Sequence, residues 1–425
     1  MLIEFSLSNF RSFKDRFTLS MEASADDWLE ETNVAEIDGR RILKSAAIFG
    51  PNAGGKTNFL AAMSSFRDFV QMSSKESQSG EKIPVVPFRL HTATESAPTH
   101  FEVIFLQHGT RYRYGFEATT ERVTSEWLFS QKESIRETRL FTREDSIIDA
   151  STEFKEGKGL EARTRSNALF LSVVAQFNGE ISGAIMQWME GFRDISGLDD
   201  ADYMPFTAQL LKNKHYSRRI EDLTRRAVGG FEQIKTFDLT EEEVEKSLPK
   251  DLSEAIRRLI APSPLTGISI KMVHNKFDAD DRSCGLVEFN LKTDESAGTQ
   301  KFLAMTGPFI HTLDAGSVLF VDELEARLHP LLTKALVSLF NGGANRKNAQ
   351  LIYATHNDGL LNPAHIRRDQ VWFAEKDEFG ASKLFSLAEF RVRKDAKFNR
   401  EYLLGQFGAV PDVRDIEKAV INVSS

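Results

Sequence analysis

The sequence of 425 residues predicts an α/β fold that combines a mixed sheet with a parallel core and contains a helical insertion. Three observations predict this class. A buried strand, a glycine-rich turn and a helix follow one another over residues 45–70. Three continuous apolar runs, Val318–Val321, Leu351–Ala354 and Val371–Ala374, have the pattern of strands buried on both faces of a parallel sheet. Short alternating segments near the N-terminus favour antiparallel strands.

Composition indicates a globular protein larger than one ordinary domain. The chain carries 54 Lys and Arg against 62 Asp and Glu, and its net charge of −8 is unusual for an autonomous nucleic-acid binder. The only cysteine, Cys284, excludes an intrachain disulfide and favours a reducing compartment. No run approaches the roughly 18 apolar residues of a membrane span, and the first residues lack a signal-peptide pattern. We therefore expect a cytoplasmic protein with no membrane partner.

Residues 1–165 are expected to form an N-terminal lobe that holds an antiparallel sheet and the glycine-rich turn. Residues 2–7 and 17–21 alternate apolar and polar, as strands do. Residues 101–106 and 112–116 flank a turn-rich link and predict a hairpin, and a further strand of the same sheet is expected at residues 123–129.

Residues 166–262 are expected to be a helical insertion or lid, because apolar residues recur there at helical spacing. Residues 263–425 are expected to form a C-terminal lobe. Besides the three core runs, this lobe has predicted strands at residues 268–273 and 286–291.

The turn at residues 50–57 reads Gly-Pro-Asn-Ala-Gly-Gly-Lys-Thr, which is the spacing of a P-loop. Backbone N–H groups and a helix N-terminus then face one anion. Lys56 would reach the β- and γ-phosphates of ATP, and the Thr57 hydroxyl would bind Mg²⁺. The predicted nucleotide-binding residues of this segment are Asn52, Gly54, Gly55, Lys56, Thr57 and Asn58.

Two of the predicted core strands end in residues suited to phosphate chemistry. Asp322 and Glu323 follow the first, so Asp322 would complete the Mg²⁺ site and Glu323 would polarise the attacking water. His356 follows the second and would contact the γ-phosphate. With Lys56, Glu323 and His356 are the predicted catalytic residues.

These motifs, together with Asp294–Gln300, resemble the ABC-type ATPases in the branch shared by SMC proteins, RecF and the OLD ATPases. The resemblance implies an ABC-type P-loop NTPase head. It also implies that Ser296 and Gly298 stand in the signature loop, which binds the γ-phosphate of ATP held by the opposite protomer. Glu295, Ala297 and Thr299 depart from the commonest signature. A plain helix cap is the alternative interpretation of this loop.

Three further assignments follow from the resemblance. Residues 325–330 occupy the place of the family's D-loop, although His329 and Pro330 also suit a structural role at a helix start. Arg11, in Asn-Phe-Arg-Ser-Phe, is expected near the nucleotide, with a surface arginine as the alternative. Gln176 is expected to be a Q-loop ligand of Mg²⁺, with an ordinary helix end as the alternative.

The ending, from Phe390 to Pro411, resembles stand-alone OLD-like AAA-family ATPases of bacterial abortive-infection and anti-phage operons. The resemblance implies a homodimer or higher homo-oligomer whose ATP-driven closure controls a separate effector, an operon-encoded nuclease or toxin, in response to DNA or a phage-derived trigger. The alternative is a DNA-repair clamp of the RecF or SMC type. Basic residues between Lys212 and Arg226 would serve such a clamp, or would form a solvated helix face.

Overall fold

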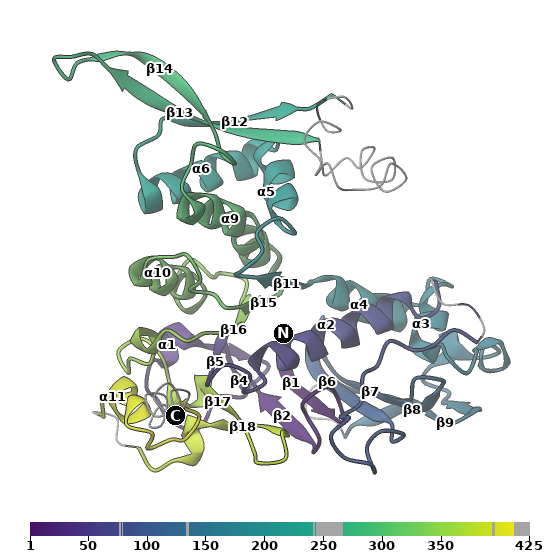
Figure 1. Cartoon of the computed structure of the whole chain (residues 1–425). Helices are drawn as coiled ribbons and strands as arrows, with labels where there is room; N and C mark the ends of the chain where they lie inside the picture. Colours follow the sequence, from purple (N-terminus) through teal and green to yellow (C-terminus); the bar gives the residue numbers. More distant parts are fainter. Residues whose placement is uncertain are drawn as a thin grey trace, which may run out of the picture. The chain divides into compact units, whose positions relative to one another are not determined.

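The computed structural model describes residues 1–75, 78, 80–132, 136–240, 243, 267–392 and 396–411. The chain divides into two compact units, which are described separately below (Figure 1). The first unit consists of Met1–Asp194, Gly316–Glu323 and Val337–Ser425, and the second of Ile195–Ala315 and Leu324–Leu336.

The first unit contains a seven-stranded sheet in which every recorded strand pair is antiparallel. Its strand order is β10-β9-β8-β7-β6-β1-β2. The predicted hairpin and the predicted antiparallel character of this sheet are confirmed. The strands are β1 (Leu2–Ser8), β2 (Phe17–Ser20), β6 (Thr99–Gln107), β7 (Thr110–Ala118), β8 (Val123–Lys132), β9 (Thr138–Glu144) and β10 (Ile147–Ala150).

A long helix, α2 (Lys56–Met72), lies over this sheet (Figure 1). Its apolar residues recur at helical spacing, so one face is buried in a core of aromatic side chains. Phe66 stacks on Phe116 of β7 with ring centroids 5.6 Å apart, and Phe5 of β1 meets Phe59 edge-on at 6.0 Å. The seven-stranded sheet therefore packs against α2, the helix that follows the P-loop, along the length of that helix.

A second sheet of the first unit has the order β11-β15-β16-β5-β17-β18. The pairs β15–β16, β16–β5 and β5–β17 are parallel, which confirms the predicted parallel core. Parallel strands end at the same edge, so the residues that follow them lie along that edge. The strands are β5 (Ser45–Phe49), β11 (Phe192–Ser196), β15 (Val318–Asp322), β16 (Gln350–Ala354), β17 (Val371–Lys376) and β18 (Ser382–Ser386).

Shorter elements complete the first unit, and α10 runs from the second unit into it. The helices are α1 (Glu30–Asn33), α3 (Phe170–Ala175), α4 (Glu180–Glu190), α10 (Pro330–Asn341) and α11 (Phe398–Leu403), with short 3₁₀ turns η1 (Lys155–Gly157), η2 (Glu161–Arg163), η3 (Asp358–Leu360), η4 (Arg368–Gln370) and η5 (Leu387–Glu389). A small antiparallel ribbon joins β3 (Val34–Ile37) to β4 (Arg40–Leu43).

The second unit packs helices against one face of a three-stranded antiparallel sheet of order β12-β13-β14 (Figure 1). Its core joins residues from the helices and from β12 and β13, among them Ile220, Met272 and Leu303. The elements are α5 (Met204–Leu211), α6 (Lys214–Val228), β12 (Gln233–Asp238), β13 (Ile268–Phe277), β14 (Ser283–Asn290) and α9 (Ala297–Ala315).

The segment after residue 166, expected to be a helical insertion, contains two strands among its helices. β11 and β12 interrupt it, because Phe192 and Ile195 are recruited to the edge of the parallel sheet and Ile234 to the core of the second unit. The strands predicted at 268–273 and 286–291 correspond to β13 and β14, which form an antiparallel hairpin.

The units also divide the chain differently from the predicted lobes, since β5 and β15–β17 share one sheet. The boundary predicted at 262/263 lies outside the described residues. Within the part of the chain that the structure describes, no helix has the length and apolar character of a membrane span.

Candidate nucleotide-binding site

The P-loop connects the fully buried strand β5 to the first turn of α2. Gly55 occupies the N-cap position of α2 with φ of 115°, and Gly50 has φ of 149°. Residues with side chains rarely adopt these values, so the two glycines meet a backbone requirement. The chain thereby turns within a few residues from strand to helix, and the N–H groups at the start of α2 are directed into the turn.

A second requirement for glycine comes from strand β17, which lies directly behind the loop. A Cβ atom at Gly50 would lie 2.2 Å from the carbonyl oxygen of Ala374, and one at Gly54 would lie 2.8 Å from the same oxygen. A Cβ atom at Gly55 would lie 2.3 Å from Ser382 Oγ on β18. The loop therefore rests on the β17–β18 hairpin without space for a methyl group.

Lys56 is buried and lies against the loop itself. Its ammonium donates hydrogen bonds to the carbonyl oxygens of Gly50, at 2.8 Å, and Pro51, at 3.0 Å. The positive charge is thus held within the curve of the P-loop. Thr57 and Asn52 are exposed beside it, so their side chains are accessible to a ligand.

Asn58, in the first turn of α2, contacts the Asn-Phe-Arg-Ser-Phe turn. Its side-chain amide donates to Ser12 Oγ at 2.8 Å, and Ser382 Oγ donates to the same oxygen at 2.8 Å. Ser12 is therefore the centre of a polar contact that joins α2, β18 and the Asn-Phe-Arg-Ser-Phe turn. Asn58 supports the loop from behind in this arrangement.

Arg11 lies in that same turn, one residue before Ser12. It is exposed, has φ of 50°, and its guanidinium carbon lies 5.4 Å from the centroid of the Phe10 ring. The turn is fixed by reciprocal backbone hydrogen bonds between Phe10 and Phe13, both 2.8 Å. The structure thus brings Arg11 to the neighbourhood of α2 through Ser12 and leaves its head group accessible.

Asp322 and Glu323 stand at the end of β15, at the edge of the sheet where β5 leads into the P-loop. One strand, β16, separates β15 from β5. The Asp322 Oδ1 atom is buried without a hydrogen-bond partner among the described residues. A buried carboxylate oxygen without a partner is costly, and a hydrated Mg²⁺ is a suitable partner for it. Asp322 and the Thr57 hydroxyl are therefore fitted to hold that ion with phosphate oxygens.

Glu323 has φ of 49°, in the left-handed region that costs a residue with a side chain about 1 kcal/mol or more. Such strain persists where the surroundings impose it and is concentrated at functional sites. Here the left-handed turn ends β15 immediately after Asp322.

His356 follows β16 at the same edge of the sheet and is exposed. Thr355, before it, is fully buried and donates its backbone N–H to Ile48 of β5 at 3.0 Å. Asn357, after it, caps η3 by accepting the Gly359 N–H at 3.0 Å. His356 is therefore presented between two fixed residues.

The structure does not bring Gln176 to this edge, and the expected metal contact is corrected. Its side-chain amide donates to Ser74 Oγ at 2.7 Å. Ser74 follows the C-terminal end of α2, and a helix of 17 residues is about 25 Å long. Gln176 thus lies at the opposite end of α2 from Thr57. It ends α3, as the alternative interpretation proposed.

The predicted signature residues belong to the second unit. Ser296 precedes α9, is exposed, and its Oγ accepts the Thr299 N–H at 3.1 Å as an N-cap does. Glu295, which departs from the family pattern, has its Oε1 atom 2.6 Å from Nε2 of His274 on β13. The contact with His274 is a local structural reason for a glutamate at position 295, where the family signature has another residue.

The predicted D-loop segment is fixed to the same helix. A Cβ atom at Gly298 would lie 3.0 Å from the carbonyl oxygen of Arg327, so the two backbones approach closely. The buried ammonium of Lys301 donates to the carbonyl oxygens of Leu324 and Ala326. Pro330 begins α10, which confirms the structural role considered for it.

Sequence reasoning missed the support behind the P-loop. Ser12 lay within a motif that was singled out for Arg11, so a signal for it existed. Ser382 and Ala374 had none, because the hairpin formed by β17 and β18 approaches the loop only in the folded chain.

The family model described as "AAA domain, putative AbiEii toxin, Type IV TA system" matches residues 45–362. The matched residues begin with β5 and extend past His356, so they include the P-loop, the acidic pair and the histidine. Among curated proteins, no sequence matches this one.

Solved structures of SMC head domains are similar to the chain at low identity. The SMC head domain from Thermotoga maritima is 14% identical, with a TM-score of 0.41 over 91% of this chain and 98% of that chain. An SMC head bound to the C-winged helix domain of ScpA is 13% identical, with a TM-score of 0.46 over 91% and 97%. An SMC head with an extended coiled coil, bound to the C-terminal domain of ScpA derived from Pyrococcus furiosus, is 12% identical, with a TM-score of 0.37 over 91% and 96%.

Proposed function

We propose that this chain, which belongs to the family of AAA domains described as putative AbiEii toxins of type IV TA systems, binds ATP with Mg²⁺, hydrolyses it, and thereby controls a separate effector in anti-phage defence. One observation carries the ATPase part of the proposal. The P-loop, Asp322, Glu323 and His356 follow three neighbouring strands of one sheet, at the edge where those strands end.

Each of these residues has a distinct task in hydrolysis. The N–H groups of the P-loop and the Lys56 ammonium neutralise the phosphates, and this requires Lys56 to exchange its contacts with Gly50 and Pro51 for phosphate oxygens. Thr57 and Asp322 would hold Mg²⁺, which would supply charge neutralisation at the phosphate oxygens. Glu323 accepts a proton from the attacking water, and His356 donates a hydrogen bond to the γ-phosphate.

The second part of the proposal is that two copies close on two ATP molecules. In each site Lys56 comes from one protomer and Ser296 from the other. The exposure of Ser296 at the start of a 19-residue helix supports this, because helix N-termini bind anions and this one is accessible. Closure of the dimer is then the output that ATP drives, and hydrolysis reverses it.

The third part is the control of an effector on another polypeptide, a nuclease or toxin encoded in the same operon and released during phage infection by DNA or a phage-derived trigger. The family description, which refers to a toxin and to a TA system, supports this setting. Co-purification from the native operon would identify the effector. An unrelated gene neighbourhood, with no protein retained by the ATP-loaded chain, would refute it.

A DNA-repair clamp is the second candidate, and the basic residues near α6 are the observation that favours it. Their charge is partly neutralised by neighbouring acids, however. Arg219 lies 2.5 Å from Asp314, Arg225 lies 3.3 Å from Asp222, and Lys212 pairs with Asp238. Salt-sensitive DNA binding by the purified chain would favour the clamp.

Replacement of Glu323 by Gln tests the proposed chemistry directly. The variant keeps the shape of the side chain and loses the base, so ATP turnover should fall by about 100-fold or more while ATP binding persists. The ATP-loaded chain should then accumulate as a dimer, measured by light scattering during size-exclusion chromatography. Unchanged turnover would reject Glu323 as the base. Loss of ATP binding in this variant would show that the side chain has another role.

A further inference from the structure

The segment near the C-terminus, residues 396–411, folds back on itself through a small number of specific contacts. Tyr402, on α11, donates its hydroxyl to the carbonyl oxygen of Ala409 at 3.0 Å. Gly405 and Gly408 have φ of 75° and 68°, which allow the chain to reverse between the two. Burial raises the pKa of Tyr402 to about 12, so its hydroxyl stays protonated and remains a donor.

The Tyr402 ring packs on two residues, in strands β17 and β5, that adjoin the contact between β17 and the P-loop. It stacks on Phe373 of β17 with ring centroids 5.2 Å apart and an interplanar angle of 18°. It meets Phe49, the last residue of β5, edge-on at 6.1 Å. Phe49 immediately precedes Gly50, and Phe373 immediately precedes Ala374. The two rings that Tyr402 packs on are therefore the immediate chain neighbours of Gly50 and Ala374, which form the contact between the P-loop and β17.

That contact leaves no free space, because the Ala374 carbonyl oxygen lies against Gly50 and Gly54. A displacement of β17 at Phe373 must therefore displace the loop as well. The residue after Ala374 is also engaged: Glu375 Oε2 accepts the Ala409 N–H at 3.2 Å. Residues 396–411 thus contact β17 at Phe373 and at Glu375, on either side of Ala374, whose carbonyl oxygen packs against the P-loop.

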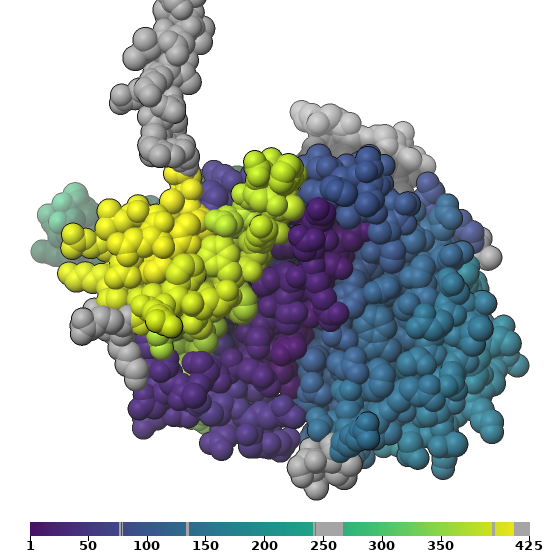
Figure 2. All heavy atoms as spheres, turned by 90° about the horizontal axis from the view of Figure 1, so that it is seen from below, coloured from purple at the N-terminus to yellow at the C-terminus, as the bar shows by residue number. Residues whose placement is uncertain are grey.

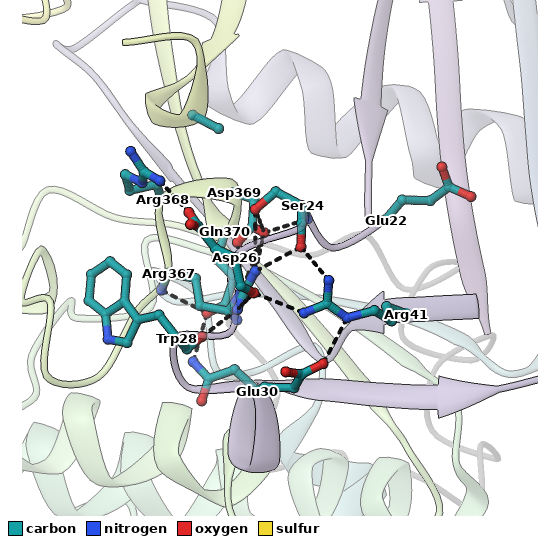
Figure 3. A network of polar contacts seen from close by, with 12 residues as sticks. Glu22, Ser24, Asp26, Trp28, Glu30, Arg41, Arg367, Arg368, Asp369 and Gln370 are labelled. Carbon is teal, nitrogen blue, oxygen red and sulfur yellow. Dashed lines mark hydrogen bonds and ion pairs between the residues drawn. The ribbon is translucent and has the colours of Figure 1, made fainter. Parts of the chain in front are cut away.

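The other side of the segment is fastened to a network of buried polar groups (Figure 3). Arg367 is nearly fully buried and donates to Asp369 Oδ2 at 2.7 Å and to the carbonyl oxygens of Ser24, Asp26 and Trp28. Trp28, which this network positions, meets Phe398 of α11 edge-on at 5.8 Å. In Figure 2 the C-terminal residues, in yellow, form one continuous surface with the rest of the first unit.

We infer that Tyr402 is a positioning residue for the nucleotide site, which sets the P-loop through Phe373 and Ala374. The inference rests on the proposed function, since the site must bind ATP for its position to matter. It gives a role to residues 402–411, the Tyr-Leu-Leu-Gly-Gln-Phe-Gly-Ala-Val-Pro segment. α11 also packs on η3, which follows His356, so the same helix supports both phosphate-facing loops.

The test compares two tyrosines in the full-length chain that are equally buried. Tyr402 and Tyr112 are both 7% exposed, and Tyr112 stacks on Phe105, away from the P-loop. We expect Tyr402→Leu to weaken the binding of ATP with Mg²⁺ by about tenfold or more, because small displacements of a binding loop are costly. Tyr112→Leu should leave the Kd within about twofold of the wild type while lowering the Tm similarly. Tyr402→Phe, which keeps the ring, should restore most of the affinity.

Glu375→Ala provides a second variant that leaves the aromatic core intact, and a Kd about threefold weaker is expected from it. Calorimetric titration with ATP and a thermal melt are measured for every variant. Wild-type affinity in both Tyr402→Leu and Glu375→Ala would overturn the inference, and so would equal losses in Tyr402→Leu and Tyr112→Leu. A wild-type chain that binds no ATP, and is indistinguishable from Lys56→Ala, would instead refute the proposed function and the inference with it.

Discussion

Replacing Gly55 by Ala tests whether the β17–β18 hairpin fixes the conformation of the P-loop. The new methyl group would lie 2.3 Å from Ser382 Oγ and 2.7 Å from Ser382 Cβ. Ordinary contacts between such atoms begin near 3.4 Å, so the Ser382 side chain, the loop or the hairpin must move by about 1 Å. The backbone must also keep φ of 115° with a side chain attached.

The size of the effect follows from these two costs. A residue with a side chain in the left-handed region costs about 1–2 kcal/mol. Inserting a methyl group into a close contact costs about 1–3 kcal/mol. Together they amount to about 2–5 kcal/mol if the loop stays in place. If the loop relaxes instead, ATP affinity falls, and every 1.4 kcal/mol corresponds to about tenfold in Kd.

A double-mutant cycle separates the two costs. Ser382→Gly removes both atoms that the new methyl group would meet, and leaves the backbone requirement of Gly55 unchanged. We therefore expect Gly55→Ala with Ser382→Gly to regain about 1–3 kcal/mol relative to the sum of the single changes. The assays are ATP titration for the Kd and denaturant unfolding for stability. Additive effects, with no coupling in either assay, would refute the reasoning that the hairpin determines the loop.

Three further predictions concern charged groups. Glu126→Ala should lower the free energy of unfolding by about 3–5 kcal/mol, because it leaves the buried Arg143 without its acidic partner; a loss below about 1 kcal/mol in urea unfolding would contradict this. A hydrogen bond from Arg113 lowers the pKa of Glu137 below its ordinary value of 4.5. The ionised Glu137 side chain therefore stabilises the folded chain above pH 4.5, and this stabilisation is lost as the pH falls through the lowered pKa. Glu137→Gln should therefore be less stable than the wild type at pH 7, by at most about 1 kcal/mol, with a difference that shrinks in acid and not in alkali. Asp322→Asn should remove Mg²⁺-dependent turnover without lowering the Tm measured in EDTA, since it discharges a buried oxygen that has no partner in the described chain; a lowered Tm would assign Asp322 a structural role.

The local strand–loop–helix arrangement could be predicted because its signals lie close together in the sequence. β5 was predicted with the bounds that it has, and the hairpin of β6 and β7 followed from alternation around a turn. The match of residues 45–362 confirms the predicted resemblance to AAA-family ATPases of abortive-infection systems. Such patterns are local, so one sequence is enough to reveal them.

The failures arose where tertiary contacts decide the structure. β11 has little strand pattern of its own and forms because the parallel sheet offers an edge for Phe192 and Ile195. Gln176 was assigned by resemblance to the family's Q-loop, although its side chain contacts Ser74 beyond the far end of α2. The support of the P-loop by Ala374 and Ser382 involves residues more than 300 positions away in the chain, which no spacing rule could connect.

Complementation between two inactive variants tests the central claim, that each ATP is bound between two copies of the chain. Lys56→Ala removes the P-loop ammonium, and Ser296→Arg blocks the exposed helix start that is proposed to face the partner. Neither variant should hydrolyse ATP alone. An equal mixture of the two should recover about a quarter of the wild-type rate, because about half of the dimers are mixed and each has one intact site. Turnover in the mixture that does not exceed the sum of the separate variants would contradict the claim.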